Sequence, residues 1–398
     1  MFDFSNVPFF DNHTHLIDVD HAKHALYTSR EVKPVDLTLE FLHGRRESAP
    51  EAETGDRGIS HRQALTLESV GVVKTLVHHM AQFLGCEETL TAVTAARNAR
   101  TREDVAGYAR ALYADQHIFA EMIDDGAPID GPLLACFPCQ KLRLFQMDPL
   151  LRRLLKECES YLTMLERFSA SVTQAISEGF IGVKCHVLEV VTCPPRVVQQ
   201  AEAEAAYTQA VAGETQGFDT VYLAVLSHAM LLCQELDVPI HIHTGCTGNP
   251  NDLMPVTCHP FRLVPFLETP VFYRTTVVML HAGFPHVRDA AMLTHGFPNL
   301  WVDMSWVLPW ISLNFEQCLL EVLGVAPHAK VMLGSGQHGI PELVWLSAKV
   351  AKSALASVMK RLVETDMLSV AQAQEAAEML LYKNAARLYK LTVPGENL

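Results

Sequence analysis

The chain has 398 residues, of which 49% are hydrophobic and 19% are charged, and its formal net charge is −14 at pH 7. This composition is that of a globular protein with a large core. The acidic balance and the lack of a Lys/Arg cluster exclude nucleic acid as a partner, because nucleic-acid binders need a concentrated positive surface.

The sequence also argues against secretion and membrane insertion. The first residues lack a basic stretch followed by an apolar one, so no secretion signal is expected. No uncharged apolar run is long enough to span a bilayer. The 10 cysteines form no dense framework, which favours free thiols in a reducing compartment. We therefore expect a cytoplasmic protein.

The first predicted strand is the short apolar run at residues 8–10, which leads into His13 and His15. Residues 44–62 are polar and predict a surface loop. The stretch from about residue 60 to 122 is rich in Ala and Leu, has regular charges and contains little Pro. It predicts a helical insertion after strand one, suited to act as a lid.

Beyond the insertion, short apolar runs alternate with helical stretches. Helices of about ten or more residues between strands imply parallel βαβ units, and uninterrupted apolar strands fit a sheet buried on both faces. The further predicted strands are 142–148, 179–188, 238–245, 275–283, 299–306 and 330–336. The early region has room for one more.

These units predict an α/β fold, a (β/α)8 barrel spanning residues 1–398 as one domain. Periodicity alone leaves a doubly wound open sheet as the alternative. A Rossmann domain of that type would carry G-x-G-x-x-G after its first strand, and the sequence has no such motif there.

Histidines gather at the ends of the predicted strands. His13 and His15 stand two residues apart, as do His241 and His243, and His281 ends a further apolar run. Residues i and i+2 of a strand point the same way, so each pair can reach one ion. Imidazole nitrogens suit a divalent transition metal, with zinc expected and manganese or iron as alternatives.

The chain resembles the amidohydrolase superfamily of the amidohydrolase-2 type, and within it the domain associated with glutamine-synthetase-like proteins. The matching stretches cover nearly the whole chain: DNHTH, GFIGVK, VPIHIHTG, VVMLHAGFP, NLWVDMSW, KVMLGSG, HGIPE and NAARLYKL. The resemblance implies a metal-dependent barrel enzyme with one or two ions, a small-molecule substrate and assembly into homo-oligomers.

The resemblance also implies roles for individual residues. His13, His15, His243 and His281 would be metal ligands, and the position of His281 polarises water or substrate in members with a single ion. Lys184 would bridge two ions if its amine were carboxylated. A free ammonium cannot bind a cation, so the alternatives are a clamp on substrate or a lysine paired with a carboxylate.

Several further positions receive weaker assignments. His241 is expected beside the ligands or facing the substrate. One of Cys185 and His186 is expected to face the site. Asp124 belongs to an Asp-Asp-Gly sequence that predicts a turn at the end of a strand, with a place in the pocket as the alternative.

One position departs from the family. Gly336 stands where the family has a strand-eight Asp that takes the proton of the attacking water, and glycine has no side chain for either proton transfer or metal binding. His338 is the nearest candidate base, because its ordinary pKa suits proton transfer near neutrality. Glu342, also a candidate for substrate binding, and Asp303 are alternatives.

The leading functional hypothesis is a metal-dependent hydrolase of a C–N bond in a small polar substrate. The family association suggests a γ-glutamyl or related amide. The missing strand-eight Asp keeps two alternatives open, a metal-dependent decarboxylase, lyase or cyclase on the same barrel, and a catalytically silent barrel that binds a small ligand.

Overall fold

In the computed structural model, which describes residues 2–15, 69–124, 138–245, 258–337 and 340–393, eight parallel strands form one sheet in chain order. The strands are β1 (Phe9–Thr14), β2 (Ile118–Asp124), β3 (Gln140–Gln146), β4 (Phe180–Cys185), β5 (Ile240–His243), β6 (Val277–Leu280), β7 (Leu300–Asp303) and β8 (Val331–Met332). The segment after β8 returns to β1 through backbone hydrogen bonds, Asn12 N to Leu333 O (3.0 Å) and Gly336 N to His13 O (2.7 Å). The predicted (β/α)8 barrel is confirmed.

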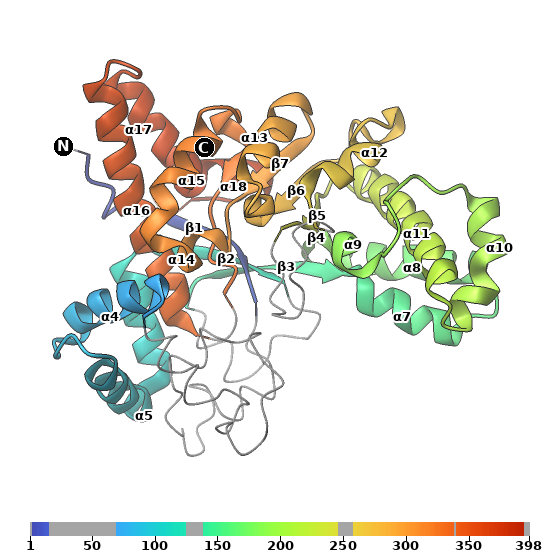
Figure 1. Cartoon of the computed structure of the whole chain (residues 1–398). Helices are drawn as coiled ribbons and strands as arrows, with labels where there is room; N and C mark the ends of the chain where they lie inside the picture. Colours follow the sequence, from blue (N-terminus) through green and yellow to red (C-terminus); the bar gives the residue numbers. More distant parts are fainter. Residues whose placement is uncertain (1, 16–68, 125–137, 246–257, 338–339, 394–398) are drawn as a thin grey trace.

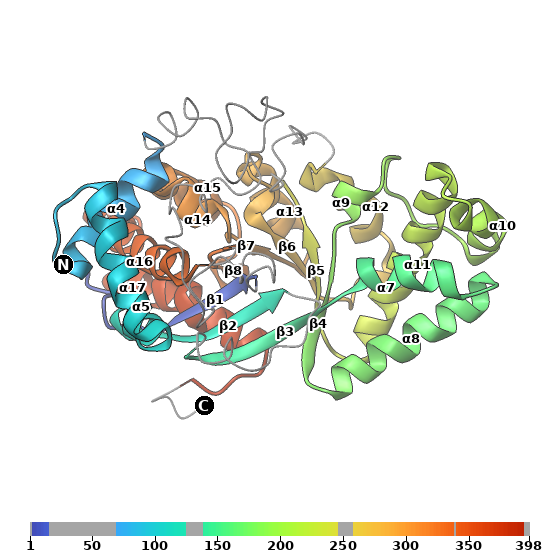
Figure 2. The ribbon, with the colours of Figure 1, turned by 90° about the horizontal axis from the view of Figure 1, so that it is seen from below.

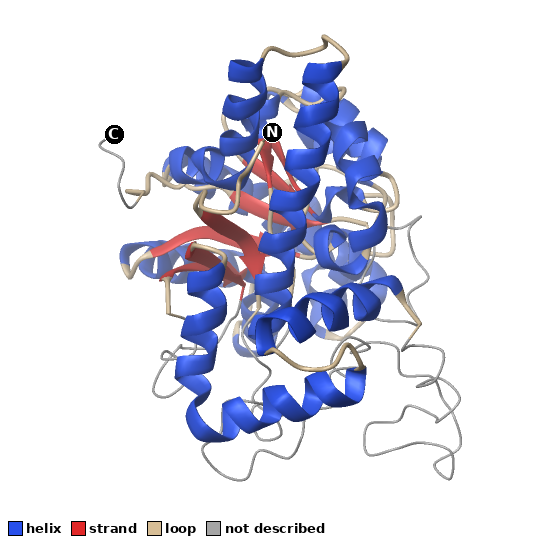
Figure 3. Ribbon diagram, turned by 90° about the vertical axis from the view of Figure 1, so that its left-hand side faces the viewer, coloured by secondary structure: helices blue, strands red, loops and turns tan. Residues whose placement is uncertain are grey.

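Helices surround the strands (Figures 1 and 3). The helices are α4 (Gly71–Leu84), α5 (Leu90–Asp115), α7 (Met147–Glu157), α8 (Tyr161–Ser177), α9 (Val187–Val190), α10 (Gln200–Val211), α11 (Thr215–Glu235), α12 (Val264–Leu267), α13 (Val287–Gly296), α14 (Val307–Trp310), α15 (Phe315–Leu323), α16 (Pro341–Glu364), α17 (Val370–Glu378) and α18 (Asn384–Leu388). Among the described residues, none of them is long and apolar enough to cross a membrane.

Apolar periodicity explains how helix and strand pack together. Every residue of β6 is buried, as expected for a strand covered on both faces. The helix α7 buries one stripe at helical spacing, made of Met147, Leu150, Leu151, Leu154 and Leu155. The next helix, α8, begins where the Ser160 side chain accepts a hydrogen bond from the backbone of Thr163.

The strand missing from the sequence analysis is β2. It begins at Ile118, inside the stretch of about residues 60–122 for which a helical insertion is predicted. The helix α5 ends at Asp115, and His117 takes a positive φ of 51° before the strand starts. The run IFAEMID that follows is apolar enough for a buried strand but carries no Gly or Pro that would mark its start. Residues 60–68 lie outside the described chain.

Candidate metal centre

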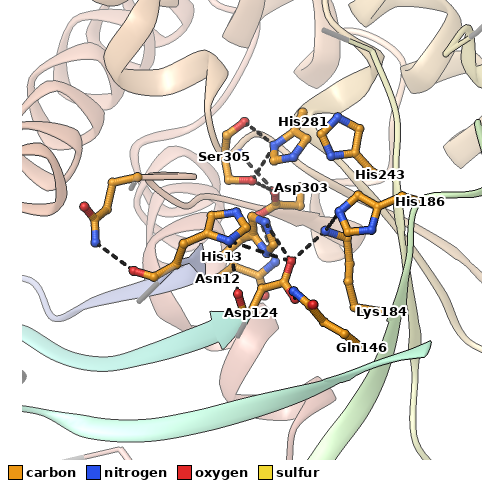
Figure 4. A network of polar contacts seen from close by, with 12 residues as sticks. Asn12, His13, Asp124, Gln146, Lys184, His186, His243, His281, Asp303 and Ser305 are labelled. Carbon is orange, nitrogen blue, oxygen red and sulfur yellow. Dashed lines mark hydrogen bonds and ion pairs between the residues drawn. The ribbon is translucent and has the colours of Figure 1, made fainter. Parts of the chain in front are cut away.

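Polar side chains converge at the C-terminal end of the barrel. His13 belongs to β1, Asp124 is the last residue of β2, Lys184 lies in β4 and His243 ends β5. His281 follows β6 directly. Figure 4 shows these side chains pointing toward one another. The carboxyl ends of all strands in a parallel barrel open on one face, which allows residues so far apart in sequence to meet.

An irregularity in the pairing of β1 accompanies two neighbouring side chains that both contact residues of the barrel interior. The pairing of β1 with β2 shifts within residues 11–14. Neighbours in a regular strand point to opposite faces. Here Asn12 donates its amide to Asp303 of β7 (2.8 Å), while the ring of His13 lies 5.2 Å from that of His281 between centroids. Both residues therefore contribute to the same end of the barrel, as bulges beside functional sites often allow.

The first group of candidate ligands is His13, His15 and Asp124, whose donor atoms lie within 4.8 Å of one another. Oδ2 of Asp124 is 3.8 Å from Nε2 of His13 and 4.0 Å from Nδ1 of His15. Both ring nitrogens of His13 are buried, and neither has a hydrogen-bond partner among the described residues. Because buried polar atoms without partners are costly, this group fits a divalent cation.

Burial keeps the imidazoles of the site neutral. It lowers the pKa of His13 well below its usual value, and the positive charge of Lys184 lowers this pKa further. Burial also lowers the pKa of His15 to about 4 and the pKa values of His241 and His281 to about 3. The neutral imidazole is the form that binds a metal, so these side chains are ready to do so at neutral pH.

Lys184 is fully buried and held by two partners. Its Nζ donates to Oδ2 of Asp124 at 2.7 Å and contacts Nε2 of His186 at 3.1 Å. Nδ1 of His186 lies 3.1 Å from Asp148, which also accepts the hydroxyl of Tyr222 at 2.5 Å. Burial alone would raise the pKa of Asp124, but the Lys184 ammonium brings it below its usual range. Lys184 and Asp124 thus form a buried ion pair.

A second group of candidate ligands adjoins the first. It consists of His186, Glu189 of α9 and His243, again with donor atoms within 4.8 Å of one another. Nε2 of His243 lies 3.0 Å from Glu189, and its ring centroid is 4.5 Å from that of His281. Because His186 also contacts Lys184, the two groups are joined through this lysine.

His281 is oriented by Ser305. Its Nδ1 lies 3.2 Å from the Ser305 carbonyl and 3.0 Å from the Ser305 hydroxyl. Donation of the Nδ1 proton to the carbonyl leaves Nε2 unprotonated and able to bind a metal or accept a proton. The Ser305 hydroxyl and amide both donate to Asp303. Burial raises the pKa of Asp303 to about 6, although these hydrogen bonds act against that rise.

His241 lies in a separate contact with Tyr389. Its Nε2 is 3.4 Å from the Tyr389 hydroxyl, and the two rings are stacked with centroids 6.0 Å apart. The same hydroxyl donates to Asn12 at 2.7 Å. Nδ1 of His241 is buried and has no hydrogen-bond partner within the described part of the chain. His241 therefore contacts the residues that hold Asn12 in place.

The end of β8 offers no space for a side chain at Gly336. Its φ is +57°, and a Cβ atom there would lie 2.5 Å from the backbone nitrogen of Trp306. The candidate base His338 lies outside the described residues. Glu342, in the first turn of α16, is fully buried and paired with Arg97 of α5 (Nε to Oε1, 2.6 Å). Its carboxylate accepts hydrogen bonds from Arg97 and Tyr108, which both lie in α5.

Several residues of the site escape sequence reasoning or are weighed too lightly by it. Asp124 is expected first as a turn residue, and His186 only as one of two options. Glu189 and Ser305 carry no motif at all. The chain could have revealed Ser305 through its place two residues after Asp303 at a strand end, a spacing that permits a local side-chain hydrogen bond to the backbone.

A third group of potential ligands shares no residue with the first two. It contains His259, His286 and Asp289. Nδ1 of His259 accepts a hydrogen bond from the backbone of Phe261, so the proton of the neutral ring sits on Nε2, which lies 3.2 Å from Asp289. A histidine that binds a metal instead donates its second ring proton. Hydrogen bonding therefore accounts for His259 and Asp289, whereas Nε2 of His286 is buried without a hydrogen-bond partner among the described residues.

The chain is similar to known proteins in sequence and in fold. A sequence profile described as amidohydrolase matches residues 178–391. Protein fluG of Emericella nidulans is 29% identical over 154 residues, which are 38% of this chain and 17% of fluG. The match thus spans about a sixth of the length of that relative.

Solved structures resemble the chain over almost its full length. A candidate metal-dependent hydrolase from Lactobacillus casei superposes with a TM-score of 0.77 at 21% identity, covering 98% of both chains. A glucuronate isomerase from Caulobacter crescentus superposes with a TM-score of 0.69 at 15% identity, covering 98% of this chain and 93% of the other. At these identities the likeness concerns the fold.

Proposed function

The chain belongs to the amidohydrolase family, and we propose that it is a metal-dependent hydrolase that cleaves an amide-type C–N bond in a small polar substrate. The observation that carries the proposal is the group of His13, His15 and Asp124, with donor atoms within 4.8 Å of one another. His243 and His281 lie beside it. Two imidazoles and a carboxylate suit zinc, which is the proposed metal, with manganese and iron as the alternatives.

A divalent metal at this site would polarise the scissile carbonyl and make an attacking water more acidic. The protein's own side chains supply the remaining functions. His281, oriented through Nδ1 by Ser305, presents an unprotonated Nε2 that can bind the metal or accept a hydrogen bond from water or substrate. Lys184 places a buried positive charge beside the site, where it would stabilise negative charge developing on a substrate oxygen.

A non-hydrolytic reaction on the same barrel, such as a decarboxylase, lyase or cyclase step, is the second candidate. Gly336 favours it, because the residue that takes a proton from water in the family is absent at this position. The isomerase from Caulobacter crescentus has the same fold, so the barrel itself accommodates chemistry other than hydrolysis.

The test combines metal analysis with a product assay. We expect purified protein to carry stoichiometric zinc and to release amine or ammonia from one member of a panel of γ-glutamyl and other small amides. His13→Ala should lose both the metal and the activity. His78→Ala is the matched control, because His78 lies on the surface in α4 and pairs with Glu88.

Two other outcomes would contradict the proposal. Metal-dependent consumption of an amide or carboxylic acid without release of amine would support the second candidate. A protein without stoichiometric metal, in which His13→Ala changes neither ligand binding nor turnover, would be a silent ligand-binding barrel.

A further inference from the structure

We propose that Asp124 supplies the acidic ligand of the metal site formed by His13 and His15, in place of the strand-eight aspartate that this chain lacks. The inference rests on the proposed function, since it assigns a ligand to the metal that this function requires. It makes β2, rather than β8, the strand that contributes the carboxylate.

The position of β2 allows a carboxylate at its end to take the place of one from β8. The strand β1, which carries His13, pairs with β2 on one side and meets the segment after β8 on the other. Figure 2 shows β1 between its two neighbours. Adjacent strands are about 4.8 Å apart, so a carboxylate at the end of either neighbour can reach the same histidines. Oδ2 of Asp124 lies 3.8 Å from Nε2 of His13.

The segment after β8, on the other side of β1, cannot supply a carboxylate at position 336. A Cβ atom on Gly336 would lie 2.5 Å from the nitrogen and 2.8 Å from the Cα atom of Trp306. These are backbone atoms, which cannot rotate away as a side chain could. The amide of Trp306 is itself fixed by a hydrogen bond to Ser335 at 3.0 Å. The backbone after β7 thus fills the space that a strand-eight carboxylate would need.

Asp124 is oriented as a metal ligand should be. Its Oδ1 accepts the side-chain amide of Gln146 at 2.9 Å, which leaves Oδ2 facing the histidines. Its backbone carbonyl lies 3.0 Å from Nδ1 of His15. The same Nδ1 lies 4.0 Å from Oδ2, so the His15 ring packs against both the carbonyl and the carboxylate of Asp124. One residue therefore provides a carboxylate oxygen and contacts a neighbouring ligand through its backbone.

The competing interpretation is that Asp124 serves only as the counter-ion of Lys184. Nζ of Lys184 contacts the same oxygen, Oδ2, at 2.7 Å. A carboxylate oxygen has two lone pairs and can serve an ammonium and a metal together. Asp303 is a poorer candidate, because among the described residues it is Asp124, and not Asp303, whose donor atom lies within 4.8 Å of those of His13 and His15.

The experiment compares zinc affinities of metal-free protein, measured by competition with a chromophoric chelator. The informative pair is Lys184→Met and the double variant Lys184→Met/Asp124→Asn. The double variant leaves no buried charge without its partner, so it is expected to fold, which circular dichroism checks. Asp303→Asn is the matched control, a buried carboxylate at the same end of the barrel.

Loss of a partner that only orients a ligand typically costs about 10- to 100-fold in metal affinity. Loss of a ligand should cost more. We therefore expect the double variant to bind zinc at least about 100-fold more weakly than Lys184→Met, with an altered Co2+ absorption spectrum. Asp303→Asn should lose no more than about 100-fold and keep the Co2+ spectrum, since it leaves all the proposed ligands in place.

Equal zinc affinity and equal Co2+ spectra for Lys184→Met and the double variant would overturn the inference. Asp124→Asn alone, compared with the unaltered protein, gives the same comparison with Lys184 present. His13→Ala distinguishes a failure of the Asp124 assignment from a failure of the proposed metal function. If His13→Ala loses zinc while the double variant keeps it, only the assignment of Asp124 fails. If His13→Ala also binds zinc normally, the proposed metal function fails.

Discussion

Replacing Gly336 by alanine tests whether the end of β8 is closed to side chains. Gly336 has a φ of +57°, and the added Cβ atom would lie 2.5 Å from Trp306 N and 2.8 Å from Trp306 Cα. Gly85, at the end of α4, provides the control, because its φ is +68° and a Cβ atom there meets nothing within 4 Å. The two positions share the left-handed backbone and differ in their surroundings.

The magnitude follows from two separate costs. Holding a residue with a Cβ atom in the left-handed region costs about 1–2 kcal/mol, and both alanine variants should bear this cost. Forcing extra volume against a packed neighbour costs about 1–3 kcal/mol more, and only Gly336→Ala should bear it. We therefore expect Gly336→Ala to destabilise the protein by about 2–5 kcal/mol and Gly85→Ala by about 1–2 kcal/mol.

Thermal and urea unfolding of the metal-free protein would measure the difference. Removal of metal matters because a bound ion stabilises the folded state and would mask part of the effect. Gly336→Asp should be at least as destabilised as Gly336→Ala and should gain no amidase activity. Equal unfolding midpoints for Gly336→Ala and Gly85→Ala would show that the strand end can accommodate a side chain, and the steric reasoning would be refuted.

Three further predictions concern stability. Arg97→Met should cost about 3–5 kcal/mol in urea unfolding, because it removes the cation paired with the buried Glu342 carboxylate, and adding Glu342→Leu should recover most of this loss. A double variant no more stable than Arg97→Met would contradict this prediction. Burial raises the pKa of Glu121 to about 7. The protonated side chain therefore contributes to the free energy of unfolding below the ordinary pKa of glutamate, and this contribution is lost as the pH rises through about 7. Melting temperatures of Glu121→Gln, measured between pH 5 and about 8, should lack this decline. Parallel profiles of melting temperature against pH for the variant and the unaltered protein would contradict this prediction. Finally, a chelator should lower the melting temperature of the unaltered protein but not of His13→Ala; an equal shift in both would argue against zinc at His13.

The barrel could be predicted from the sequence because its signals are local. The strand β6, for example, is a run of four apolar residues followed directly by His281, and helices such as α7 carry a clear apolar stripe. The strand β2 was the exception, since Ile118 follows a helical stretch with no Gly or Pro to mark the change. Helix propensity does not change sharply at such a boundary. The segment forms a strand because of its tertiary contacts with the neighbouring strands.

The histidines could be identified from spacing, but their arrangement could not. The position of Asn12 and His13 on one side depends on a bulge, which changes the alternation that strand patterns assume. The contact of Lys184 with Asp124 joins residues 60 positions apart, and no periodicity connects them. Sequence reasoning thus finds residues that share a strand, while pairing between strands requires the folded chain.

The balance of charge explains why the source of the carboxylate matters. A carboxylate from β8 would approach His13 from the side away from β4, whereas Asp124 comes from β2 and contacts Lys184 directly. In this arrangement the ammonium offsets the carboxylate in the absence of metal, and the protein can bury the site without an unpaired charge. An ion entering the site shares the carboxylate with Lys184, which makes the affinity for metal and the state of the lysine interdependent. This coupling is absent from a site whose acidic ligand stands apart from the β4 lysine.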